Sequence, residues 1–282
     1  MSWFFYKSSY LNSTLAMRTA DGRLIGLVAG KHDQYFPFFH ETCKWDNMLL
    51  YVDGLGVGYS ASEIQGLEVK AIAERQAHIT FQGDLKGNDG AMHTLEFALD
   101  FALAPGKQHT FAKLVNLPWL MGMCWQPYYC MLRPHHSRFV LDGKPLPLSH
   151  GNGELERGDL VNWKSRLFAF GYHYLCLVHP SDEYAIIDIQ GRSAIPDLPG
   201  GKFMDWLFHQ SHTTLLLNAS TCTKAKLQGE PVIHVLIEDQ VDLGLALLDR
   251  QFVLVRDAQN REFFGLREVF HPIKYLSVFA GR

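Results

Sequence analysis

The 282-residue chain lacks the short motifs that identify several large enzyme classes. Its five cysteines form no CxxC pair, so a cysteine-based structural zinc site is not indicated and buried free thiols are expected. Neither G-x-S-x-G nor HEXXH occurs, which argues against a serine hydrolase with a nucleophile elbow and against a zinc protease. The glycine-rich stretch 54–60 is interpreted as a turn or bulge, because no helical pattern follows it.

A strong charge of one sign is also missing. Lys and Arg number 26 against 29 Asp and Glu, for a formal net charge of -3. Such a chain has no overall field that attracts phosphate backbones, so no nucleic-acid partner is expected.

Long hydrophobic runs are absent as well. The longest candidate, 114–124, is interrupted by Asn116 and Pro118, and a spanning helix needs about 18 or more apolar residues. The first 17 residues lack the basic and apolar regions of a signal peptide. The sequence therefore predicts no transmembrane segment and a cytoplasmic location, and it leaves a peripheral membrane contact open.

What the chain does contain is short apolar or alternating runs bounded by turn residues, within a composition that is 47% hydrophobic and 13% aromatic. Asp-Gly pairs at 21, 53, 89 and 142 are typical of tight hairpin turns. Helical spacing is confined to one short segment, 201–211. The pattern predicts an all-β protein with few short helices.

The segment 125–163 contains most of the residues that are candidates for a catalytic or binding role. It contains two pairs of neighbouring aromatic or histidine side chains, a hairpin turn and two glutamates. In chain order the features are Gln126, Pro127, Tyr128 and Tyr129, then His135 and His136, then Leu141, Asp142 and Gly143, then Gly153 and Glu156.

This order resembles the lipocalin-like superfamily that includes tocopherol cyclase, carotenoid 1,2-hydratase and AttH-type proteins. The Trp-Gly that closes the family motif is missing, and the nearest tryptophan is Trp163. The resemblance implies two lipocalin-like (calycin) β-barrel halves, expected at 1–145 and 146–282, and a cavity for a hydrophobic ligand. We expect the turn-rich stretch 149–159 to separate the two halves.

Glu154 and Glu156 are two residues apart, so on a strand their side chains lie on the same face. In an apolar cavity a carboxyl group has a raised pKa and suits proton donation. Glu156 matches the family motif and is the preferred catalytic acid, with Tyr128 or His136 as the alternative. The competing interpretation places both glutamates on a solvated outer face together with Lys164.

Aromatic residues of the same region are candidates for the wall of a ligand site, although aromatic side chains on strands are commonly ordinary core. The predicted binding residues are Trp119, Trp125, Tyr129, Glu154 and Trp163. His209 and His212 are three apart, but no third ligand is assignable from spacing, so neither a metal nor a cofactor is expected.

These residues favour an enzyme that acts on a hydrophobic polyene, prenylated or polyketide-like small molecule. Its reaction would be a cyclisation, hydration or isomerisation, carried out by confinement and a placed acid. The alternative is a non-catalytic carrier that binds a lipid or pigment in the same pocket. A third hypothesis is an interaction module without a cavity.

Overall fold

The chain is described here by a computed structural model. The structure describes residues 4–36, 41–53, 55, 57–61, 64–72, 75–104, 109–111, 122–164, 170–179, 184–193, 213–220, 222–224, 232–242 and 247–271.

Within these ranges the strands form two antiparallel sheets. The first sheet comprises twelve strands, and its main path runs β11-β10-β7-β9-β12-β1-β2-β3-β4, with β6 beside β7, β5 beside β6, and β8 beside β9. The bounds are β1 (Phe4–Thr19), β2 (Leu24–Phe36), β3 (Glu41–Val52), β4 (Val57–Ala61), β5 (Glu68–Ile72), β6 (Gln76–Lys86), β7 (Met92–Leu103), β8 (His109–Phe111), β9 (Gly122–Leu132), β10 (Arg138–Leu141), β11 (Lys144–Pro145) and β12 (Leu148–Lys164).

The second sheet has seven strands in the order β16-β15-β14-β13-β19-β18-β17. Its bounds are β13 (Phe170–His179), β14 (Tyr184–Ser193), β15 (Thr213–Asn218), β16 (Cys222–Lys224), β17 (Val232–Asp242), β18 (Leu247–Arg256) and β19 (Glu262–His271). The described residues include one helical element, the 3-10 turn η1 (Pro134–His136). The all-β prediction is confirmed; the segment 201–211, predicted to be helical, lies outside the described residues.

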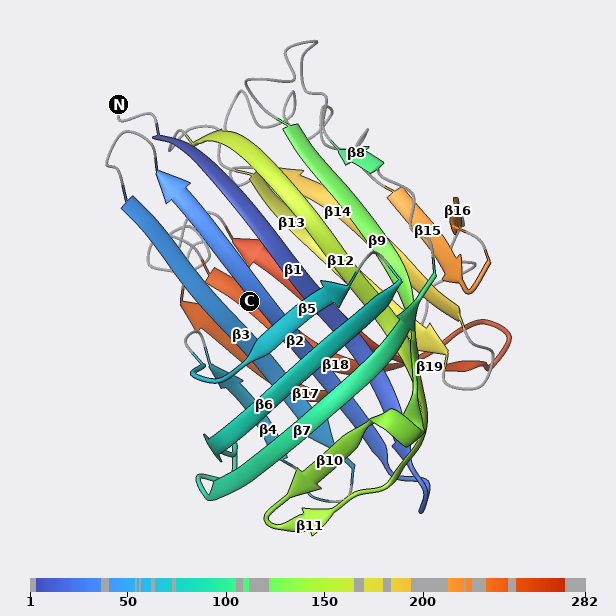
Figure 1. Cartoon of the computed structure of the whole chain (residues 1–282). Coiled ribbons are helices and arrows are strands. Elements are labelled where there is room, and N and C mark those ends of the chain that lie inside the picture. Colours follow the sequence, from blue (N-terminus) through green and yellow to red (C-terminus); the bar gives the residue numbers. More distant parts are fainter. Residues whose placement is uncertain are drawn as a thin grey trace.

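The first sheet curls over itself, so that β5, β6 and β7 cross in front of β1, β2 and β3, while the second sheet lies behind them (Figure 1). This arrangement creates two large cores, and a smaller cluster that includes Val253 and Phe263 lies apart from them. One large core lies inside the curl and includes Leu15, Leu27, Phe97 and Leu155. The other lies between the two sheets, with Val28 and Leu49 from the first sheet against residues such as Phe252 from the second.

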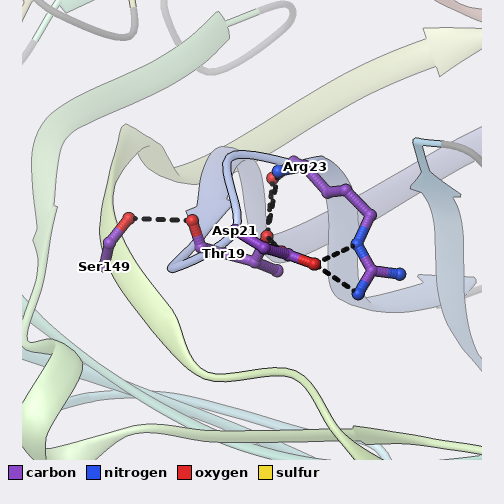
Figure 2. Close-up of polar contacts among 4 residues, drawn as sticks. All are labelled: Thr19, Asp21, Arg23 and Ser149. Carbon is purple, nitrogen blue, oxygen red and sulfur yellow. Dashed lines mark hydrogen bonds and ion pairs between the residues drawn. The ribbon is translucent and has the colours of Figure 1, made fainter.

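The predicted Asp-Gly turns at 21, 89 and 142 join the paired strands of hairpins, and Gly54 of the fourth pair lies outside the described residues. Asp142 and Gly143 have φ angles of 51° and 71°, the left-handed values that a two-residue hairpin turn requires, and they join β10 to β11. The turn from β1 to β2 contains Asp21, which contacts the side chains of Thr19 and Arg23, as Figure 2 shows. Arg23 lowers the pKa of this exposed carboxyl to about 2.

The same turn anchors the start of β12. The Ser149 hydroxyl donates a hydrogen bond to the Thr19 carbonyl oxygen at 3.2 Å (Figure 2), and β12 then pairs with β1 along almost its whole length. The register shifts between Arg18 and Thr19, at Ser149, and beyond this irregularity Thr14 lies opposite Glu154. The shifted register fixes which β12 side chains point toward the second sheet.

The expectation of a turn-rich separator at 149–159 is wrong, because these residues lie in the continuous strand β12. Its glycines serve close packing. A Cβ at Gly153 would meet the Thr14 carbonyl oxygen and lie 2.9 Å from the Leu15 Cα, and a Cβ at Gly158 would meet the Tyr10 ring. The glycine content of this stretch predicts a turn, whereas in the structure these glycines allow a neighbouring strand to approach closely.

The chain passes from the first sheet to the second after Lys164. The strand that follows the predicted boundary at 145/146 therefore still pairs within the first sheet. The division into two domains at that boundary stays a prediction. No helix of the described residues is long and apolar enough to cross a membrane.

Candidate functional site

The two glutamates predicted from their spacing are buried. Glu154 is 0% exposed and Glu156 is 9% exposed. Between them, Leu155 points into the core inside the curl, so the alternation of a strand turns both carboxyl groups to the opposite face, toward the second sheet. The interpretation as a solvated outer face is therefore wrong.

Tyr174 of β13 contacts Glu154 across the space between the sheets. Its hydroxyl donates a hydrogen bond of 2.8 Å to Oε2 of Glu154, and both side chains are buried. Burial raises the pKa of Glu154 well above its usual value, and the nearby Glu156 and Glu268 raise it further, whereas the Tyr174 hydrogen bond opposes the shift. Glu154 is therefore protonated under conditions in which an exposed glutamate is ionised.

Several polar atoms beside Glu154 have unused hydrogen-bonding capacity. Among the described residues, Oε1 of Glu154 is buried without a hydrogen-bond partner, as are the Thr14 hydroxyl and the side-chain carbonyls of Asn12 and Asn152. Thr14 lies directly opposite Glu154 in the β1–β12 register. Because most buried polar atoms in proteins are paired, four such atoms on one face of two neighbouring strands indicate a site adapted to polar contacts.

The amide of Asn152 has a defined orientation. Its Nδ2 donates to the His179 carbonyl oxygen at 3.0 Å, which leaves Oδ1 as the unpartnered atom. Asn12 in turn leans over Gly30 of β2, where a Cβ would collide with its side-chain oxygen. Gly30 thus permits the Asn12 amide to lie between the sheets.

The second sheet contributes a line of polar and charged residues facing these groups. Tyr174, Glu268, Arg250 and Asp239 are successive cross-strand neighbours on β13, β19, β18 and β17. Arg250 is 0% exposed, and its Nη2 and Nε lie 2.8 and 3.2 Å from Oδ2 of Asp239.

Arg250 also links the two sheets, since its Nη1 donates to Oδ1 of Asn47 on β3 at 3.2 Å. Glu268 is 7% exposed, and burial raises its pKa to about 7 although Arg250 opposes the shift. We call this set the inter-sheet polar layer; its members are Asn12, Thr14, Asn47, Asn152, Glu154, Glu156, Tyr174, Asp239, Arg250 and Glu268.

The remaining predicted residues are only partly brought to this layer. Tyr129 is buried opposite Glu154 in the β9–β12 register and belongs to the core between the sheets. Its neighbour Tyr128 belongs to the core inside the curl, on the other face of the first sheet. His136 is exposed in η1, after the end of β9, whereas Glu156 is buried opposite Pro127.

The tryptophans add little to this description. Trp125 pairs with Gly158 and His109, and Trp163 pairs with Phe5, but their side chains lie outside what the structure describes. Trp119, His209 and His212 lie outside the described residues altogether. Within the described part of the chain, no three His, Cys, Asp or Glu side chains gather as metal ligands.

Sequence reasoning missed Tyr174, Arg250 and Glu268. A signal for Arg250 exists in the strand pattern. Arg250 stands between Leu248 and Phe252 on the inward face of β18, where both neighbours are buried. An isolated charge within an inward apolar series is expensive to bury and marks a position with a specific partner.

Comparison with solved structures shows which known fold this architecture is similar to. The chain aligns with a Nitrosomonas europaea protein assigned as an AttH over 96% of this chain and 93% of that one, with a TM-score of 0.51 and 11% identity. This chain has the AttH-like fold. The resemblance drawn from residues 126–156 is thus confirmed at the level of the fold, over nearly the whole chain.

Two further structures align with the AttH-like fold of this chain. Kievitone hydratase from Nectria haematococca aligns over 93% of this chain and 88% of its own, with a TM-score of 0.42 and 9% identity. CghA with Sch210972 aligns over 94% and 88%, with a TM-score of 0.41 and 6% identity. No protein-family model and no curated protein sequence matches the chain.

Proposed function

We propose that the chain is an enzyme that protonates a hydrophobic small molecule bound between the two sheets, with Glu154 as the acid. The observation that carries the proposal is the state of this carboxyl group. It is fully buried, one oxygen accepts the Tyr174 hydrogen bond, and the other has no partner among the described residues.

Protonated Glu154 has the properties of a general acid. The proton on Oε1 passes to a carbon or oxygen of an alkene, epoxide or enone in the substrate, and Glu154 becomes a carboxylate. The Tyr174 hydroxyl stabilises that carboxylate because it already donates to Oε2. The proton released when the cationic intermediate is quenched returns to Glu154, so the cycle balances.

The fate of the cation determines the reaction class. Attack by water gives hydration, attack by an internal alkene or hydroxyl gives cyclisation, and loss of another proton gives isomerisation. The apolar residues around the polar layer, among them Tyr129, Ile187 and Phe252, favour a polyene, prenylated or polyketide-like substrate. The role that we expected for Glu156 passes to Glu154, because the contact with Tyr174 is made by Glu154.

Glu154→Gln tests the proposal. It keeps the shape of the side chain and removes the transferable proton, so turnover is expected to fall by about 10² to 10⁴ while ligand binding persists. We would incubate the protein in deuterium oxide with farnesol, a prenylated phenol and a conjugated polyene, and follow deuterium incorporation by mass spectrometry. The matched control is Glu68→Gln, at an exposed glutamate of β5.

Two results would contradict the proposal. If Glu154→Gln retains wild-type deuterium incorporation, Glu154 is not the acid. If the wild-type protein binds these compounds and returns them unchanged and without deuterium, it is a carrier rather than an enzyme.

A further inference from the structure

The inter-sheet polar layer contains more acidic than basic groups. Of the buried polar residues described, Arg250 is the one cation, and it is already engaged with Asp239 and Asn47. Glu154, Glu156 and Glu268 share the same layer. Ionising several neighbouring carboxyl groups in a poorly solvated space is unfavourable, so their protonation states depend on one another.

Glu268 lies between the Tyr174–Glu154 pair and the Arg250–Asp239 pair of the inter-sheet polar layer, and it can interact electrostatically with both. On one side its cross-strand neighbour is Tyr174, which holds Glu154, and on the other side its neighbour is Arg250. Tyr174 of β13 and Arg250 of β18 flank Glu268 in the sheet, Asp239 of β17 lies beyond Arg250, and Glu154 of β12 interacts with Glu268 electrostatically across the space between the sheets. Glu156 lies two residues from Glu154 on the same face of β12.

We infer that Glu268 and Arg250 are positioning residues that control the protonation of Glu154. The negative charge of Glu268 keeps Glu154 protonated, and the positive charge of Arg250 stabilises the ionised form of Glu268. This inference rests on the proposed function of Glu154. When Glu268 is ionised, its negative charge disfavours a second one on Glu154, so Glu154 keeps its proton to a higher pH. The positive charge of Arg250 lowers the free-energy cost of ionising Glu268 inside the protein.

The direction of each effect follows from the charges. The pKa of Glu268 is about 7, so above that pH the group is mostly ionised and the pKa of Glu154 is raised by it. Removing the Glu268 charge must therefore lower the pKa of Glu154. At an effective dielectric constant of about 20, two charges couple by about three pH units when they are about 4 Å apart and by about one pH unit when they are about 10 Å apart, so a shift of at least about one pH unit is expected.

The test uses Glu268→Gln and measures the pKa of Glu154 without substrate. Heteronuclear NMR of the full chain with carboxyl-labelled glutamate follows each titration, and the Glu154 signal is assigned by its loss in Glu154→Gln. We expect the Glu154 titration to shift downward by at least about one pH unit in Glu268→Gln. Glu268→Asp, which keeps the charge, should restore most of the wild-type value.

The matched control is Glu262→Gln, on the same strand at a side chain that is 52% exposed, and it should leave the Glu154 titration unchanged. With an active substrate, the alkaline limb of the turnover profile should move to lower pH in Glu268→Gln by the same amount. An unchanged Glu154 titration in Glu268→Gln overturns the inference and leaves the proposed function intact. Wild-type turnover in Glu154→Gln instead overturns the proposed function, whatever the titration shows.

Discussion

Arg250 should carry a large share of the stability of the contact between the sheets. Arg250→Ala removes the partner of Asp239, whose side chain is 20% exposed, and the donor to Asn47. Breaking a buried ion pair from one side costs about 3 to 5 kcal/mol, because the remaining charge is left in a poorly solvated place. The partial exposure of Asp239 places the expected cost near the lower end.

Thermal unfolding followed by circular dichroism measures this cost. A loss of this size lowers Tm by on the order of 10 °C in a chain of this length. Arg256→Ala is the matched control, since Arg256 is on the same strand but 58% exposed and pairs with an exposed Glu262. Such surface pairs contribute less than about 1 kcal/mol, so the control should lose little.

A second substitution separates the lost charge partner from lost packing. Asp239→Asn removes the charge that Arg250→Ala leaves unpaired, so the double variant should be less destabilised than the sum of the two single variants. Equal Tm values for Arg250→Ala and Arg256→Ala would refute the reasoning. Strict additivity in the double variant would show that packing, and not the ion pair, accounts for the loss.

Two further predictions concern the first sheet. Gly153→Ala places a Cβ against the backbone of Thr14 and Leu15, so it should destabilise the protein by about 1 to 3 kcal/mol, visible as a lower Tm; an unchanged Tm would contradict this. His93 joins two turns by contacts with Asp142 and Asp89, and Asp142 raises its pKa. Because the folded pKa exceeds the unfolded one, this stabilisation is complete below about pH 6.5 and is lost as pH rises through the folded pKa, so the Tm gap between wild type and His93→Gln should shrink from about pH 5.5 to about pH 9. A gap that is equal at both pH values would exclude the charge as its cause.

Much of the architecture could be predicted from the sequence, because hairpin turns and period-two alternation are local properties. The Asp142-Gly143 turn and the shared face of Glu154 and Glu156 are examples. The choice between two adjacent aromatic residues is different. Tyr128 and Tyr129 point to opposite faces of one strand, and which face meets the second sheet depends on how the sheets pack.

The partners of the candidate acid could not be predicted for the same reason. Tyr174, Glu268 and Arg250 come from three strands of the second sheet, and only the packing of that sheet brings them to Glu154. The prediction of a turn-rich separator at 149–159 was wrong for another reason. Its glycines have the composition of a turn, but they allow close contact with β1, a requirement set by residues more than a hundred positions earlier.

The hydrogen bond between Asn47 and Arg250 joins residues 203 positions apart. Contacts of this sequence separation form late, because the intervening chain must first be ordered. During synthesis, Glu154 emerges before Tyr174, and both emerge before Arg250 and Glu268. Until the second sheet covers it, the Glu154 carboxyl group is solvated and has the pKa of an exposed glutamate. The candidate acid then acquires its raised pKa when the second sheet docks. The protonation of Glu154 therefore depends on the docking of the second sheet, and a chain truncated before β18 would keep Glu154 and Tyr174 but lack Arg250, Glu268 and two strands of that sheet.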